Sequence, residues 1–157
     1  MENPKLSLAS TKENKLPSNL EAEQSLIGSI LVNNDIIDEI SNIVNPGKFF
    51  DPIHRKIYEV IENLNNKGMI ANPITLKNYF ENDSGLSEVG GVDYLVKLTR
   101  FSSSIKQAID YAKIIHEMYV KRELIFISDG ISDQAKDEQT EKTGENIIEG
   151  AEKSLFD

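Results

Sequence analysis

The sequence predicts an all-α fold, in which a compact helical globular part is followed by a long antiparallel helical hairpin. From residue 16 onward apolar residues recur at helical spacing, and no run with the two-residue period of a strand competes with them. The stretch 104–129 contains neither glycine nor proline, which predicts one helix that continues for many turns. At 1.5 Å per residue this helix would be roughly 40 Å long, so part of it must project or meet a partner.

The chain opens with polar residues without a period at positions 1–15, which predict a mobile arm. The structured part begins near Leu16. A first helix follows, because Ser18 or Asn19 can cap it and Ser18 with Glu21 fits a capping box. Its apolar stripe consists of Leu26, Ile27, Ile30 and Leu31.

Two more helices are predicted in the first half of the chain. One covers residues 35–44, and Asn45-Pro46-Gly47 ends it. The next begins at Pro52, because Asp51 can cap the chain and a proline at the first helical position loses no needed hydrogen bond. Gly68 is placed to end that helix in the left-handed conformation.

Shorter elements are predicted between residues 72 and 100. A helix after Asn72-Pro73 is expected to bury three side chains, namely Leu76, Tyr79 and Phe80. Residues 81–85 form a turn cluster, and another helix opens near Gly90-Gly91. The side chains expected to face inward from that helix are Tyr94, Leu95 and Leu98.

The last part of the chain predicts a hairpin of two helices. Residues 136–144 form a charged loop, and a final apolar stripe follows it. Apolar stripes on both arms are typical of a dimerisation device, because two helices alone bury little surface. The candidate self-association residues are Ile105, Ile109, Ala112, Ile115 and Tyr119 on the long arm, with Ile148, Ala151 and Leu155 on the short arm. The same spacing would equally suit packing of the hairpin on itself.

Composition restricts the class of protein. At 157 residues the chain can bury one sizeable core, and without cysteine it has no disulfide or thiolate metal site. A signal peptide and a long apolar run are both missing from the sequence, so the cytoplasm is expected and a membrane is not. The formal charge of −9 makes the average surface repel phosphate, so direct DNA binding by this chain is not expected.

No catalytic residue, cofactor-binding residue or metal ligand is predicted. Residues 85–90 have the spacing of a phosphate-binding loop, but Gly91-Val92 follow in place of lysine and a hydroxyl residue. The two histidines lie on different predicted helices without metal-ligand spacing. His54 is expected to form hydrogen bonds at a helix start, and the aromatic residues are expected in the core instead of on a base-stacking surface.

Five segments in order resemble the N-terminal domain of bacterial replicative hexameric DNA helicases of the DnaB type. Residues 17–31, P-S-N-L-E-A-E-Q-S-L-I-G-S-I-L, are similar to the opening of that domain. Residues 49–58 resemble its F-x-x-P-x-H-x-x-I-(F/Y) element, and residues 86–95 resemble L-x-x-V-G-G-x-x-Y-L. The remaining two are the T-L of residues 75–76, and Y-A-x-x-V … R-x-L-I at 111–115 and 122–125. Asn72 replaces an expected aspartate, but it caps a helix equally well.

The resemblance covers about residues 16–156 and implies an organisation for the chain. Residues 16–101 would be the globular subdomain, and residues 102–157 the hairpin, which leads toward a linker and a RecA-like motor that are absent here. The chain is therefore expected to continue beyond Asp157. ATP and Mg²⁺ would belong to the motor, so this chain is not expected to be an enzyme by itself.

The resemblance also implies a function in DNA replication. In the family this domain is a collar that supports the hexamer as a trimer of dimers, and its hairpins give a platform in the primosome for primase and sometimes loader proteins. Ile125 and Ile131, toward the hairpin tip, are the candidate contacts for primase or a loader, together with Arg122. The alternative is an autonomous helical dimeric DNA-binding or regulatory adaptor protein, which a salt-sensitive DNA affinity would support.

Overall fold

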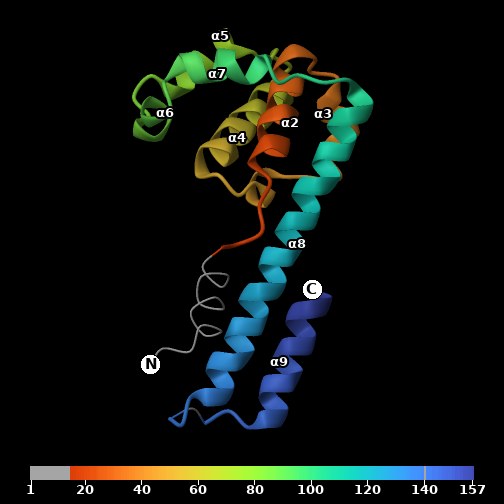
Figure 1. Ribbon diagram of the computed structural model, residues 1–157, viewed down its shortest axis with the longest axis vertical. Helices are drawn as coiled ribbons and strands as arrows, with labels where there is room; N and C mark the ends of the chain where they lie inside the picture. Colours follow the sequence, from red (N-terminus) through yellow and green to blue (C-terminus); the bar gives the residue numbers. More distant parts are fainter. Residues whose placement is uncertain (1–14, 140) are drawn as a thin grey trace, which may run out of the picture. The chain divides into compact units, whose positions relative to one another are not determined.

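The computed structural model describes residues 15–139 and 141–157 (Figure 1). Within these ranges the regular structure is helical and contains no strand, which confirms the all-α prediction. The described chain forms two compact units, Ser18–Tyr119 and Val120–Asp157, and the second also takes in residues 15–17. Apart from Lys15, the arm predicted at 1–15 lies outside the described residues.

The globular unit Ser18–Tyr119 begins with α2 (Leu20–Val32) and α3 (Ile36–Ile40). Asn19, not Ser18, caps α2, because its Oδ1 accepts a hydrogen bond from Ala22 N at 2.9 Å. The helix α3 is shorter than the predicted 35–44, and residues 41–43 continue it as turns. In these turns Ile43 N donates to Ile40 O at 2.9 Å, a tighter pattern than the α-helical one.

After the short 3₁₀ helix η1 (Pro46–Lys48), α4 (Pro52–Asn66) has the start and the end that the sequence predicts. Asp51 Oδ1 accepts a hydrogen bond from Ile53 N at 2.9 Å. Gly68 has a φ of 72°, which L side chains rarely adopt. Met69 N then donates to Leu64 O at 2.9 Å, which closes the helix end.

Three short helices follow: α5 (Pro73–Phe80), α6 (Ser84–Glu88) and α7 (Val92–Thr99). The burial predicted for Tyr79 is wrong, since this side chain is 47% exposed. Leu76 and Phe80 lie four residues apart and fill the inward face of α5, which leaves Tyr79 beside that face. The helix α6 was expected as a turn, but Asp83 caps it by accepting from Leu86 N at 3.0 Å.

The core of the globular unit is one cluster of aliphatic and aromatic side chains. The backbones of α2 and α7 approach closely at Gly28, where an added Cβ would lie 1.9 Å from Leu98 O. Only glycine fits such a contact. The largest fully buried side chains are Tyr58, Phe49, Leu26, Ile27, Ile30, Ile36, Ile40, Ile57, Ile61, Leu64, Leu76 and Leu86.

The long helix is α8 (Ile105–Lys136), and Ser104 Oγ caps it by accepting from Gln107 N at 3.2 Å. The helix passes through Gly130 without a break. The boundary between the two compact units falls at Tyr119, inside α8, and not near the predicted residue 101. The first half of α8 supplies side chains to the globular core, so it belongs to that unit.

The second compact unit contains the rest of α8 and α9 (Gly144–Phe156), which run antiparallel side by side (Figure 1). Thr143 caps α9, because its Oγ1 accepts a hydrogen bond from Asn146 N at 3.2 Å. This is the predicted hairpin, and in the following text it is called the hairpin unit. Among the described helices, none is both long and apolar enough to cross a membrane.

Candidate interaction surface on the hairpin

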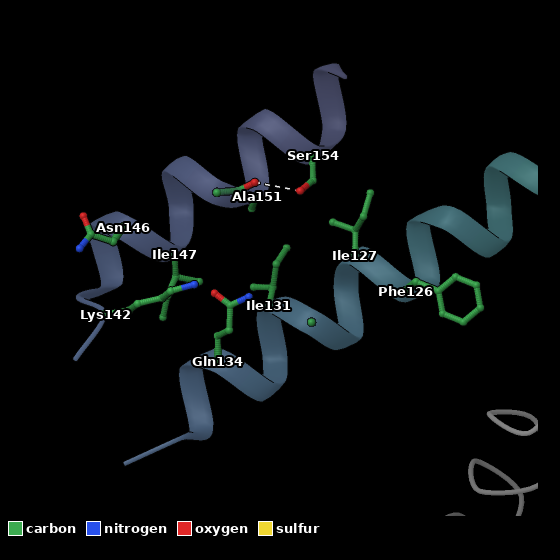
Figure 2. Close-up of a pocket in the computed structure, with 11 residues that line it drawn as sticks. Phe126, Ile127, Ile131, Gln134, Lys142, Asn146, Ile147, Ala151 and Ser154 are labelled. Carbon is green, nitrogen blue, oxygen red and sulfur yellow. Dashed lines mark hydrogen bonds between the residues drawn. The ribbon is translucent and has the colours of Figure 1, made fainter. Parts of the chain in front are cut away.

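A groove of about 390 Å³ lies between α8 and α9 of the hairpin unit. Figure 2 shows Ile127 and Ile131 of α8 opposite Ile147 and Ala151 of α9. Glycines also line the groove, and Ser154 Oγ donates to Gly150 O at 3.0 Å, so this hydroxyl is satisfied inside its own helix. Apolar walls with small residues between them allow another helix to approach closely.

The hairpin unit also exposes several large apolar side chains, of which Phe126 lines the edge of the groove. Their exposed fractions are 48% for Leu124, 53% for Phe126, 59% for Ile148, 53% for Leu155 and 89% for Phe156. Two helices cannot fold these side chains inward, because each helix has a single neighbour. Exposed apolar residues gathered on one small unit indicate a contact surface.

The hairpin unit is also strongly acidic. Residues 120–157 contain ten Asp and Glu against five Lys and Arg, a formal charge of −5. Every one of the ten carboxylates lies on an exposed residue. A partner that binds this unit therefore meets apolar side chains surrounded by negative charge.

The structure divides the predicted self-association residues into two groups. Ala112 and Ile115 are 0% and 1% exposed and belong to the globular core, against which Ile109 also packs. Tyr119 is half-buried, with Lys48 Nζ 5.8 Å from its ring centre. For these four residues the internal-packing alternative accounts for the apolar spacing. Ile105, which is 41% exposed, remains on the surface.

The short arm and the predicted partner contacts lie in the hairpin unit. Ile148 and Leu155 are exposed, whereas Ala151 and Ile131 line the groove. Ile125 is half-buried. Arg122 differs from the expected exposed contact, because it is only 5% exposed and its Nη1 donates to Pro17 O at 2.8 Å.

Sequence reasoning missed a buried polar network in the globular unit. Glu23 and His54 are each 1% exposed, and His54 Nδ1 donates to Glu23 Oε1 at 2.8 Å. The same carboxylate accepts from the backbone amides of Phe50 at 2.8 Å and Asp51 at 3.2 Å. His54 Nε2 lies 2.6 Å from the Tyr94 hydroxyl. Glu23 therefore joins α2 to the start of α4, and His54 joins α4 to α7.

The burial of this network indicates a structural role. Burial raises the pKa of Tyr94, so its hydroxyl keeps its proton at neutral pH. The three side chains are almost fully enclosed, with exposed fractions of 1% for Glu23, 1% for His54 and 8% for Tyr94. A substrate therefore has no access to them. The network therefore fixes three helices against one another. The expected role of His54 as a hydrogen-bonding residue at a helix start agrees with this geometry.

Residues 15–117 match the family model of the DnaB-like helicase N-terminal domain. The chain belongs to this family. The matched region nearly coincides with the globular unit Ser18–Tyr119 of this DnaB-like domain. The resemblance in five motifs is thereby confirmed.

Curated relatives of this DnaB-like domain are longer proteins. The replicative DNA helicase DnaB of Rickettsia felis is 41% identical over 142 residues, which is 90% of this chain and 29% of that protein. The DnaB of Rickettsia bellii is 42% identical over 142 residues, with 90% and 28% covered. The DnaB of Pasteurella multocida is 36% identical over 145 residues, with 89% and 30% covered. The chain thus spans less than a third of the length of these relatives.

Two solved structures share the fold. One is the N-terminal domain of DnaB helicase from Mycobacterium tuberculosis, with a TM-score of 0.81, 25% identity, and 90% of this chain and 99% of that chain covered. The other is a DnaB-like replicative helicase described with its interactions with primase, with a TM-score of 0.68 and 25% identity. In that case 88% of this chain and 31% of that chain are covered.

Proposed function

We propose that this chain is the collar domain of a replicative DNA helicase, where it serves assembly of the hexamer and docking of primase. The observation that carries the proposal is the hairpin unit, which exposes five large apolar side chains on two helices. Membership of the DnaB-like family and the names of the curated relatives support the same function. ATP-driven unwinding would belong to the part of those relatives that lies outside this chain.

The groove between α8 and α9 is the surface through which two hairpin units would pair. Pairing as a four-helix bundle would cover Ile131 and Ala151 and give the apolar walls a second set of neighbours. A two-fold pair of this kind uses the same surface on both copies. Three such dimers would form the collar of the hexamer.

Primase docking is assigned to the hairpin tip. The solved DnaB-like helicase described with its interactions with primase supports primase as the partner class. Ile125 remains the proposed contact, whereas Ile131 lies in the groove that hairpin pairing would cover and the burial of Arg122 favours a role inside the fold. A loader protein would use the same unit in helicases that need one.

The test is the solution mass of the chain across a concentration series, measured by light scattering for the parent and for Phe126→Asp and Ala151→Asp. Both positions line the groove. The parent is expected to form a dimer or larger species. Each variant is expected to raise the dissociation constant of that species roughly tenfold or more, because losing one apolar contact costs about 1.4 kcal/mol of binding free energy.

The matched control is Val32→Asp, which adds the same charge at a residue of the globular unit that is 62% exposed. Circular dichroism checks that every variant keeps its helices. A parent that stays monomeric at all concentrations would contradict pairing through the groove. Equal dissociation of the control and the groove variants would also contradict it.

A further inference from the structure

The hairpin unit contains a buried arginine whose burial the packing of α8 on α9 does not explain. Arg122 is 5% exposed, although it lies on α8 about one turn before Phe126, the first of the α8 residues that line the groove. It also precedes Ile131 by nine residues, which at about 100° per residue places the two side chains on opposite sides of the helix. Since Ile131 faces α9 (Figure 2), a segment other than α9 covers Arg122.

The same side of α8 is also covered one turn further along. Ile125 is half-buried, whereas its neighbours Leu124 and Phe126 are 48% and 53% exposed. Ile125 does not line the groove, and it follows Arg122 by three residues, so the two side chains share one side of the helix. This side, with Arg122 and Ile125, is here called the back of α8.

The chain segment 15–17 lies against the back of α8. Arg122 Nη1 donates a hydrogen bond to Pro17 O at 2.8 Å, and residues 15–17 belong to the same compact unit as this part of α8. Leu16 and Pro17 are both half-buried. A hydrogen bond from a guanidinium is stronger than one between neutral groups, because the donor is charged. Arg122 therefore fastens residues 15–17 to the helix.

Pro17 makes this attachment depend on Arg122. Proline has no amide hydrogen, so its carbonyl is the one backbone hydrogen-bonding group that it offers. Its ring also favours an extended conformation of the preceding residue, Leu16. Removing the guanidinium therefore removes the hydrogen bond of Pro17 and leaves the backbone hydrogen bonds of α8 in place.

We propose that residues 15–17 form a strap across the back of α8, which Arg122 holds closed and which keeps a partner from Ile125. The inference rests on the proposed function, in which Ile125 is the contact for primase. A partner that binds the back of α8 must displace the strap, so its apparent affinity falls with the fraction of chains in which the strap is open. The strap is thus an autoinhibitory contact.

Cysteine labelling tests the strap, because the chain has no cysteine of its own. Ile125→Cys is introduced into the full chain, and its rate of reaction with a maleimide is measured with and without Arg122→Met. Methionine keeps an unbranched apolar side chain but has no donor for Pro17 O. The rate should rise roughly tenfold in Arg122→Met, because a charge-assisted hydrogen bond that held the strap closed is lost.

Two control positions separate opening of the strap from unfolding. Leu124 is 48% exposed and Ile147 is 8% exposed, so Arg122→Met should leave the labelling of Leu124→Cys fast and that of Ile147→Cys slow. A second variant, Leu16→Gly, loosens the strap without changing α8 and should also speed the labelling of Ile125→Cys. If Arg122→Met speeds labelling at Ile147→Cys too, the hairpin has opened, and Leu16→Gly decides. Unchanged labelling of Ile125→Cys in Leu16→Gly would overturn the strap.

Binding of primase tests the inhibition separately. The affinities of the parent chain, Arg122→Met and Leu16→Gly for the primase of the same organism are measured by calorimetry. Both variants are expected to bind more tightly, by up to about tenfold. Equal affinities together with faster labelling of Ile125→Cys would refute the inhibitory role. If none of the chains binds primase, the proposed docking of primase fails and the inhibition with it, while the labelling rates still decide whether the strap exists.

Discussion

Replacing Gly28 with alanine tests the closest helix contact in the globular unit. Gly28 lies in the middle of α2 and is buried. An added Cβ would be 1.9 Å from Leu98 O and 2.8 Å from Leu98 C, whereas ordinary contacts begin at 3.4 Å. The obstacle is backbone and cannot rotate away, so α2 and α7 would have to separate by about 1.5 Å.

Two effects of opposite sign determine how much Gly28→Ala changes the free energy of unfolding. Alanine in a helix interior is favoured over glycine by about 1 kcal/mol. Overpacking usually costs about 1–3 kcal/mol and exceeds that range where the structure cannot yield. Because separation of α2 from α7 also loosens the core around Leu26 and Leu98, we expect a net loss of about 2–4 kcal/mol in the free energy of unfolding.

Urea unfolding followed by circular dichroism measures this loss. The control is Gly130→Ala in α8, where an added Cβ meets nothing within 4 Å, so stability should not fall there. If Gly28→Ala unfolds at the same urea midpoint and with the same slope as the parent, the argument from close packing fails.

The other predictions use the same unfolding assay. Glu23→Ala removes the acceptor of two backbone amides and of an imidazole, so a loss of about 3–5 kcal/mol is expected, and a loss below 1 kcal/mol would contradict the network. The Tyr58 hydroxyl is buried without a hydrogen-bond partner among the described residues, so Tyr58→Phe should leave the free energy of unfolding unchanged. Tyr94→Phe removes the hydroxyl that contacts His54 and should lower it by about 1–2 kcal/mol. Equal effects of the two substitutions would refute the assignment of only Tyr94 to the network. Burial raises the pKa of Tyr58 above its ordinary value, so above about pH 10 this hydroxyl ionises more readily in the unfolded chain and the free energy of unfolding falls as the pH rises. Tyr58→Phe should show a smaller alkaline decline. Ile115→Asp should unfold the globular unit, while Ile148→Asp should leave its urea midpoint unchanged, because their exposed fractions are 1% and 59%.

Features that depend on a few neighbouring residues could be predicted closely. The start of α4 at Asp51-Pro52 and its end at Gly68 need only backbone groups within one turn. The early end of α3 and the formation of α6 were missed, because short helices gain little from local bonds and depend on what they pack against.

The candidate site was predicted only in part. Apolar spacing identified Ile115 and Ile148 equally as self-association residues, although one lies in the core and the other on the surface. An apolar stripe on α8 indicates that this face of the helix must be covered, but it does not indicate which element covers it. Ile148 and Leu155 are visible in the sequence as apolar residues, yet their exposure is not.

The sequence by itself determined the helical fold class, the capped start of α4 at Asp51-Pro52 and the family, because these follow from local bonding, apolar periodicity and the order of motifs. Only the tertiary structure decided the unit boundary at Tyr119, the Glu23–His54–Tyr94 network and the exposure of Tyr79. Each of these features depends on contacts between residues that are far apart in the chain. Their contacts form only when helices pack, and packing depends on the shapes of all the faces together.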